Sequence, residues 1–367
     1  MRILQLCEYS NVHNTLAQGL RVLGHEVTVV SNGDFWKDYP RDIDVARPTG
    51  PLGGVRLYAR LLALLPSLRG YDVVQLVNPM FFELKAERLF LFYRWLRRHN
   101  RRVVLGAYGM DYYWVSVCTH DKPLRYSDFN LGDRLRQDAD AMKERRDWIG
   151  TAKERLNRLI AADCDAIVSG LYEYQVCYER DFAQKTRFIP FPIVVPVPAA
   201  SPAGPAAGER PVRLFIGISK SRSAYKGTDI MLRAAQDVVA RHPGRAELRI
   251  ANGVPFAQYQ HMMDDSDALL DQLYSYTPAM NALLAMSKGI VVVGGGEPEN
   301  YAILDEQELR PIVNVEPTYD SVCHEIEQLV LHPERLTLLK QQSIDYIKKH
   351  HDFVKVAMQY VEFWSES

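Results

Sequence analysis

A strand, a helix and a second strand fill the first 31 residues of the chain. Ile3–Cys7 is a short apolar run, and Asn14–Leu23 places leucines at helical spacing before Gly24, where a C-cap glycine belongs. Val27–Ser31 is again strand-like. A strand, a helix and a strand within about 30 residues imply parallel strands joined by a right-handed crossover. The opening segment therefore predicts a parallel α/β sheet.

The same alternation continues along the first half of the chain. Because strands alternate with helices, the pattern predicts an open, doubly wound sheet. The expected strands are Val73–Val77, Arg102–Gly106, Ala166–Ser169 and Phe188–Ile189, and the expected helices are Glu83–His99 and Arg134–Ala162.

A proline-rich segment, Pro190–Pro211, then interrupts the pattern with seven prolines. Such a segment cannot hold a regular helix or a central strand, so it predicts a domain linker. The alternation restarts after it, with strands at Arg213–Ile218, Glu247–Ala251 and Ile290–Val293 and helices at Gly227–Ala240 and Thr277–Met286.

We therefore expect two Rossmann-like, doubly wound domains that face each other across a cleft, where ligands bind beyond the carboxyl ends of the strands. The predicted division is an acceptor-side domain over 1–192, a linker over 193–210, and a donor-binding domain over 211–350. The final segment, 351–367, contains a helix, Phe353–Trp364, that we expect to pack back on the first domain.

Composition indicates a globular, cytoplasmic protein. The five cysteines are scattered without a CxxC pair, as expected of reduced, mostly buried thiols. The N-terminus lacks the features of a signal peptide, and no run reaches the roughly 18 apolar residues of a membrane span. The basic, aromatic stretch 85–102 is either a sheet-packed helix with a solvated face or a peripheral contact with the inner face of the membrane. It lacks any motif of nucleic-acid binding.

Several motifs resemble one family. Tyr108-Gly-Met-Asp111 follows a strand, and Tyr225-Lys-Gly227 opens a helix. The most specific blocks are Asp271-Gln-Leu273 and Ala285-Met-Ser-Lys-Gly-Ile-Val-Val292. These segments resemble the retaining family 4 glycosyltransferases, which have the GT-B fold. The resemblance covers nearly the whole chain, and it departs from the family at the Glu-x7-Glu motif, whose positions are held by Tyr276 and Leu284.

The resemblance implies a retaining, metal-independent, hexosyltransferase-like enzyme of polysaccharide biosynthesis with no cofactor. It would move a sugar from a nucleotide diphosphate sugar to a glycan, a lipid-linked sugar or a small molecule. Two alternatives remain open. The missing Glu pair is compatible with a GT-B pseudoenzyme that binds a nucleotide, a glycan or a partner, and a relative of the nucleotide-sugar epimerases would have the same fold.

Within this fold, the candidate donor site lies in the second half of the chain. Lys226, with Gly227 at a helix start, and Arg222 can meet the diphosphate, unless they belong to a solvated loop. Asn252 either borders the base or forms an Asn-Gly turn. Residues of the Gly-rich loop and of the Glu-Pro-Glu turn can approach the donor through backbone N–H groups or carboxylates, and these are Gly295, Gly296, Glu297 and Glu299.

The first half supplies the candidate catalytic residues His13 and Asp111, with Asn11, Asn14 and Tyr108 on the acceptor side. Asp111 either orients an acceptor hydroxyl or caps a turn, and the two asparagines either contact the acceptor or cap the first helix. The scattered Asp-x-Asp pairs are as frequent as chance gives in a chain of this composition, so we expect no metal site.

Overall fold

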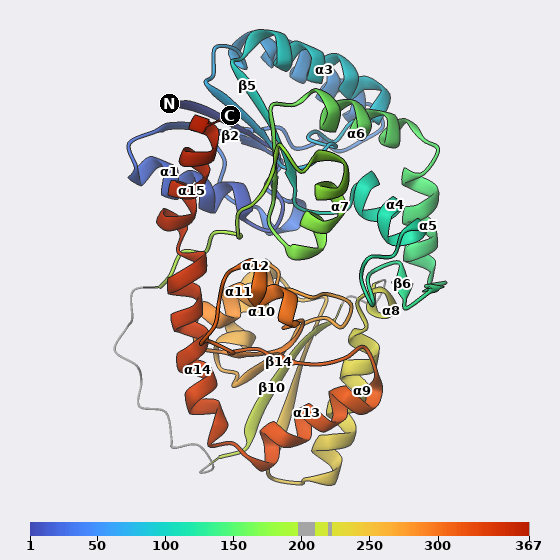
Figure 1. The fold of residues 1–367 in the computed structure, drawn as a ribbon, viewed down its shortest axis with the longest axis vertical. Coiled ribbons are helices and arrows are strands. Elements are labelled where there is room, and N and C mark those ends of the chain that lie inside the picture. Colours follow the sequence, from blue (N-terminus) through green and yellow to red (C-terminus); the bar gives the residue numbers. More distant parts are fainter. Residues whose placement is uncertain (197–209, 219–221, 367) are drawn as a thin grey trace. The chain divides into compact units, whose positions relative to one another are not determined.

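The computed structural model of the protein describes residues 1–196, 210–218 and 222–366. The chain forms two compact units (Figure 1). Unit 1 comprises residues 1–123, 143–192 and 353–367, and unit 2 comprises residues 124–142 and 193–352. The chain therefore crosses between the units four times.

A parallel sheet of seven strands forms the centre of unit 1, in the order β3-β2-β1-β4-β5-β8-β9. Helices cover the sheet, so a central strand such as β4 is buried along its whole length. The strands are β1 (Arg2–Leu6), β2 (Glu26–Ser31), β3 (Ile43–Asp44), β4 (Val73–Leu76), β5 (Arg102–Ala107), β8 (Ala166–Ser169) and β9 (Thr186–Phe188).

The last helix of the chain packs against the first helix within unit 1. A Cβ on Gly19 of α1 would lie 2.2 Å from the Phe353 carbonyl oxygen of α15, so the two helices can approach this closely only because Gly19 has no side chain. The helices of unit 1 are α1 (Val12–Val22), η1 (Phe35–Lys37), α2 (Gly53–Leu64), η2 (Leu65–Ser67), α3 (Ala86–His99), α4 (Tyr112–His120), α6 (Ala152–Asp163), α7 (Tyr172–Phe182) and α15 (Phe353–Glu366).

Unit 2 has its own parallel sheet, in the order β11-β10-β12-β13-β14. Its core includes Met231 and Val238 of α9 and Val322 and Ile326 of α13. The strands are β10 (Val212–Ile218), β11 (Ala246–Asn252), β12 (Ala268–Leu270), β13 (Val291–Gly294) and β14 (Val313–Asn314). The helices are α8 (Ser223–Lys226), α9 (Thr228–Arg241), α10 (Phe256–Asp264), α11 (Met280–Ser287), α12 (Pro298–Ile303), α13 (Tyr319–Leu331), α14 (Arg335–Tyr346) and the π-helix η3 (Ile347–His351).

Residues 124–142, here called the arm, belong to unit 2, although the sequence-based division placed them in the first domain. The arm contains an antiparallel pair of short strands, β6 (Asn130–Leu131) and β7 (Arg134–Leu135). The prediction of one helix over Arg134–Ala162 is wrong. After β7, α5 (Ala139–Trp148) ends before Gly150, whose φ of 75° breaks the helix, and α6 begins after Thr151, whose hydroxyl caps it.

The predicted linker, 193–210, lies mostly outside the described residues. All five cysteines are free and buried. Across the described part of the chain, no helix is both long enough and apolar enough to span a bilayer.

Candidate functional site

The predicted phosphate-binding residues lie beyond the carboxyl end of β10. Lys226 ends the short helix α8, and Gly227 follows with a φ of 73°, in the left-handed region that a glycine adopts without strain. Arg222 directly precedes α8, with its guanidinium 4.9 Å from the centre of the Tyr225 ring. The two cations and the start of α9 therefore share one edge of the sheet in unit 2.

The loop after β12 lies against this element. The Leu273 N–H donates to the Lys226 carbonyl at 3.0 Å, and the Asn281 side-chain amide donates to the Asp271 carboxylate at 3.1 Å. Burial raises the pKa of Asp271, and the positive charge of Lys226 opposes that rise. Asp271 therefore places a half-buried acid close to the candidate phosphate site, a role that the sequence analysis did not assign to it.

The glycine loop after β13 is closely packed. A Cβ on Gly295 would lie 2.2 Å from the Ser275 carbonyl oxygen, so a side chain at this position would require the backbone to move. The Gly296 N–H donates to the Asn314 side chain at 2.9 Å and is therefore already paired. The Ser275 hydroxyl is buried beside Gly295 and has no hydrogen-bond partner among the described residues. Ser275 is thus a candidate donor contact that sequence reasoning missed.

Glu297 and Glu299, predicted to accept hydrogen bonds from the donor, lie at the start of α12 and pair with Arg125 of the arm. Arg125 Nη2 lies 2.6 Å from Glu297 Oε2, and Nη1 lies 2.6 Å from Glu299 Oε1. The Tyr126 hydroxyl also donates to Glu297. Burial opposes the ionised form of Glu299, but the bond and charge of Arg125 and a backbone N–H bond together outweigh it and lower the pKa of that carboxyl.

Tyr276 and Leu284, at the positions that hold a Glu pair in family 4 enzymes, both lie in the segment between β12 and β13. The Tyr276 hydroxyl accepts the Arg125 backbone N–H at 2.7 Å, and the Arg125 guanidinium lies 4.9 Å from the centre of its ring. Leu284 is half-buried on α11. Arg125 and Tyr126 therefore both contact Tyr276, and no sequence motif indicated their presence there.

Asn252 ends the edge strand β11, opposite Ile218 of β10 in the register of the sheet. Its side chain is exposed, and Gly253 follows with a φ of 66°. Asn252 therefore lies at the same edge as the phosphate element, in a turn that suits an Asn-Gly pair.

In unit 1, a pocket of about 290 Å³ opens at the carboxyl edge of the sheet. Aromatic rings line it together with amides, two carboxylates and an ammonium, a mixture that suits a polar ligand with apolar faces. It is lined by Cys7, Tyr9, Asn32, Phe35, Asn78, Met80, Phe82, Glu83, Leu84, Met110, Glu144, Trp148 and Lys153. None of the five residues predicted for this domain lines the pocket.

His13 and the asparagines lie at the start of α1, where Glu8 supplies the cap. Glu8 accepts the backbone N–H groups of His13 at 3.2 Å and Asn14 at 2.8 Å, and the Asn14 side chain donates to Asn11 at 2.8 Å. The His13 ring is fully buried, and its Nδ1–H donates to the Cys7 carbonyl at 2.8 Å. Burial lowers the pKa of His13 to about 4 and raises the pKa of Glu8 to about 8.

Asp111 and Tyr108 are also buried. Asp111 caps α4 by accepting the Trp114 N–H at 2.9 Å, and it accepts the Tyr178 hydroxyl at 2.7 Å. Burial raises its pKa to about 6. The Tyr108 hydroxyl bonds to that of Tyr360 on α15. Both side chains are thus held by internal contacts of unit 1.

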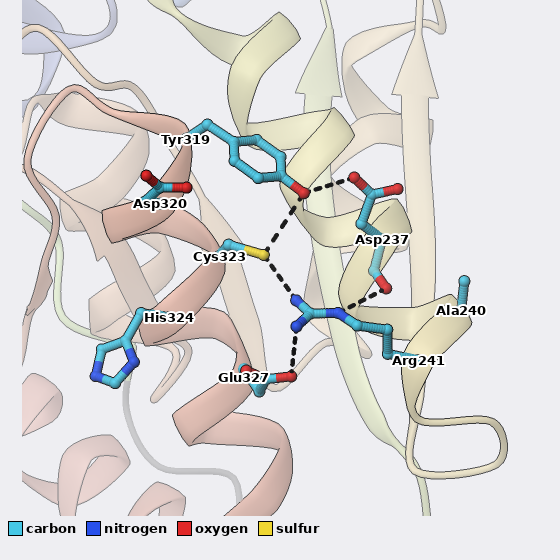
Figure 2. Close-up of a pocket in the computed structure, with 8 residues that line it drawn as sticks. All are labelled: Asp237, Ala240, Arg241, Tyr319, Asp320, Cys323, His324 and Glu327. Atoms are coloured by element: carbon cyan, nitrogen blue, oxygen red, sulfur yellow. Dashed lines mark hydrogen bonds and ion pairs between the residues drawn. The ribbon is translucent and has the colours of Figure 1, made fainter.

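A further cavity, of about 610 Å³, lies between α9 and α13 (Figure 2). Its charged side chains pair mostly with each other: Tyr319 bonds to Asp237, and Arg241 lies 3.0 Å from Glu327. At a rise of 1.5 Å per residue, Asp237 is about 14 Å along α9 from its start near Lys226. This cavity is therefore separate from the candidate donor site. Among the described residues, no cluster of His, Cys, Asp or Glu could hold a metal ion.

Comparison with known proteins confirms the fold. No family model and no curated protein sequence matches the chain. Among solved structures, Anabaena Alr3699/HepE with UDP and glucose aligns over 100% of both chains with a TM-score of 0.62 and 12% identity. WaaG, a glycosyltransferase involved in lipopolysaccharide biosynthesis, aligns over 100% of both chains with a TM-score of 0.53 and 12% identity.

An enzyme of a different class has a similar fold. The UDP-GlcNAc 2-epimerase of Neisseria meningitidis, bound to UDP-GlcNAc, aligns over 100% of both chains with a TM-score of 0.54 and 11% identity. At these identities the likeness establishes the architecture alone. The chain has the GT-B fold, built from two Rossmann-like units with parallel sheets.

Proposed function

We propose that the protein is a glycosyltransferase that transfers a sugar, most simply a hexose, from a nucleotide diphosphate sugar to a glycan or lipid-linked acceptor. The observation that carries this proposal is the set of polar and charged groups at the carboxyl edge of the sheet in unit 2. There Arg222 and Lys226 lie at the two ends of α8, the loop after β12 bonds to Lys226 through Leu273, and the unpartnered Ser275 hydroxyl lies against Gly295 of the closely packed glycine loop. The similar fold of HepE, described with UDP and glucose, supports the same choice of donor.

In the proposed reaction, Lys226 and Arg222 stabilise the charge that develops on the leaving diphosphate, so the transfer proceeds without a metal ion or another cofactor. Lys226 acts as a compact charge, whereas the Arg222 guanidinium can donate two parallel hydrogen bonds to phosphate oxygens. Glu297 and Glu299 accept hydrogen bonds from donor hydroxyls, and Asn252 borders the base. Retention of the anomeric configuration is proposed from the resemblance to family 4.

We place the acceptor in the pocket of unit 1. Tyr9, Phe82 and Trp148 offer ring faces to the apolar face of a sugar, and Asn32 and Asn78 offer amides to its hydroxyl groups. His13 and Asp111 act on the acceptor only indirectly in this proposal, because both side chains are buried outside the pocket lining.

A lipid-linked acceptor would require contact with a membrane, and the outer face of α3 suits such a contact. Arg94 and Arg98 are exposed one turn apart beside Leu91, which is 50% exposed. The neighbouring helix α2, whose Tyr58 contacts Phe92 of α3, exposes 60% of Val55. We propose that this face binds anionic lipid at the cytoplasmic surface of the membrane.

Two other functions share the fold. A pseudoenzyme is favoured by the absence of carboxylates at positions 276 and 284, and an epimerase would bind the same donor without an acceptor. Turnover separates the three: a transferase releases nucleoside diphosphate when an acceptor is supplied. An epimerase instead changes the sugar of the donor, and a pseudoenzyme does neither.

Thermal shift with UDP, GDP, ADP, CMP and dTDP, each alone and as its sugar conjugate, tests the donor site. A ligand at about 100 times its dissociation constant stabilises the folded protein by about 2.7 kcal/mol. We expect Lys226→Ala to abolish most of the shift without lowering the melting temperature of the free protein. The control is Lys288→Ala, since Lys288 follows α11 three residues before β13 and so lies at the opposite edge of the sheet. An unchanged shift in Lys226→Ala would remove Lys226 from the site.

A further inference from the structure

The arm is held firmly on unit 2 by a buried arginine. The Arg136 guanidinium donates to the carbonyls of Ala224 and Tyr225 at 2.8 and 2.9 Å, and it lies 3.6 Å from the centre of the Tyr274 ring. These contacts anchor the arm to the helix that carries Lys226 and to the loop after β12. The arm is therefore part of the structure around the candidate donor site.

At the other end of the arm, Arg125 joins the two carboxylates of the Glu-Pro-Glu turn. One guanidinium nitrogen, Nη2, lies 2.6 Å from Glu297 and 3.3 Å from Glu299, while Nη1 lies 2.6 Å from Glu299. The Glu297 side chain is only 8% exposed, whereas the side chains of Arg125 and Glu299 are 56% and 27% exposed. Arg125 thus bridges a buried carboxylate and one that can still be reached by a ligand.

This bridge has two physical consequences. Two adjacent carboxylates repel each other, and the guanidinium offsets one of the two charges. Each carboxylate oxygen can accept two hydrogen bonds, so pairing with Arg125 leaves acceptor capacity on Glu299. Because the guanidinium is planar and bonds to both residues, it also fixes the orientation of the Glu299 carboxylate and therefore the direction from which its oxygens can accept a further hydrogen bond.

We propose that Arg125 is a positioning residue of the donor site, which orients Glu297 and Glu299 so that Glu299 accepts hydrogen bonds from hydroxyl groups of the donor sugar. The inference rests on the proposed function and adds to it a residue of the arm. It assigns Arg125 to recognition of the sugar, while the diphosphate is held by Lys226 and Arg222. Loss of Arg125 should therefore weaken binding of a sugar conjugate and spare the bare nucleoside diphosphate.

The test compares the full-length wild type with Arg125→Ala and Arg125→Lys by calorimetric titration with UDP and with UDP-glucose. If the wild type responds to GDP instead, the pair is GDP and GDP-mannose. Arg125→Lys keeps the charge but lacks the planar fork whose two nitrogens bond to Glu297 and Glu299. Arg134→Ala is the matched control, because Arg134 is an exposed arginine of the same arm.

In the wild type and the control, we expect the sugar conjugate to bind more tightly than the diphosphate. In both Arg125 variants, affinity for the sugar conjugate should fall about tenfold or more, because one charge-assisted hydrogen bond contributes about that much. Affinity for the diphosphate should stay within about twofold of the wild type. Equal losses for both ligands would show that Arg125 only supports the fold, and unchanged affinities would show no role; either result overturns the inference. A wild type that binds none of the five nucleotides of the thermal-shift screen or their sugar conjugates would refute the proposed function itself, and the inference with it.

Discussion

Replacement of Arg136 by alanine should destabilise unit 2 far more than the loss of any exposed arginine. The side chain is 5% exposed, and it donates two hydrogen bonds to carbonyls of α8, lies over Tyr274 and pairs with Asp138 at 3.2 Å. A hydrogen bond that involves a charged group contributes about 1.5–3 kcal/mol, and removal of one partner from a buried ion pair costs about 3–5 kcal/mol. These contributions overlap, so we expect a loss of about 3–5 kcal/mol.

In a unit of this size each kcal/mol lowers the melting midpoint by about 2–4 °C, so the midpoint of unit 2 should fall by about 6–20 °C in Arg136→Ala. The sequence provides a convenient assay, because all five tryptophans lie in unit 1. Tryptophan fluorescence therefore follows unit 1, whereas circular dichroism follows both units. We expect the circular dichroism transition to shift more than the fluorescence transition.

Two variants sharpen this test. Arg136→Lys should recover only part of the stability, since an ammonium can bond to the two carbonyls but cannot stack a planar group over Tyr274. Arg134→Ala should melt like the wild type. A midpoint of Arg136→Ala within about 2 °C of the wild type would show that the arm does not depend on this residue, and the proposed link between the arm and the helix of Lys226 would fail.

Two further predictions concern acid stability and lipid binding. Burial opposes ionisation of Asp267, but Arg210 and Lys340 outweigh it and lower its pKa to about 2, so its carboxylate stabilises unit 2 above about pH 4 and less as the pH falls towards 2. Asp267→Asn should lose this pH-dependent contribution to the free energy of unfolding, which is about 2.5 kcal/mol. Chemical unfolding of both proteins at pH 6 and pH 2.5 measures it. If the free energy of unfolding changes equally with pH in the wild type and the variant, the prediction is contradicted. The double variant Arg94→Glu, Arg98→Glu should reduce cosedimentation with phosphatidylserine vesicles at low salt by about fivefold or more, because each basic residue near the membrane contributes about 1 kcal/mol. Binding equal to that of the wild type would exclude the outer face of α3 as the lipid-binding surface.

Much of the fold could be predicted from local patterns. The apolar runs that became β1, β4, β8 and β10 lie within a residue or two of their observed bounds, because buried parallel strands have nearly continuous apolar sequences. The short strands β12 and β14 were missed, since three and two residues give no period to recognise. The long charged stretch after Arg134 reads as one helix because its composition favours a helix throughout, and Gly150 alone marks the break.

The candidate site was harder to predict than the fold. Lys226, the glycine loop and the Glu-Pro-Glu turn lie at the edge where parallel strands end, which follows from topology alone. His13 and Asp111 also follow strand ends, but their side chains turn inwards and bond to Cys7 and Tyr178. Side-chain direction at a strand end depends on the packing around it, and one sequence does not contain that information.

The arm and the altered Glu motif are best understood as one arrangement. A glutamate at position 276 would add a third carboxylate around Arg125, which already neutralises only one of the charges of Glu297 and Glu299. Tyrosine at this position instead offers a neutral hydroxyl, which accepts the Arg125 N–H, and a ring face for its guanidinium. In the proposed donor site, the carboxylates come from the start of α12 and are oriented by the arm, so the residues at positions 276 and 284 do not by themselves argue against the proposed transfer. Tyr276→Glu should therefore fail to restore a family-like site unless Arg125 and its partners change with it.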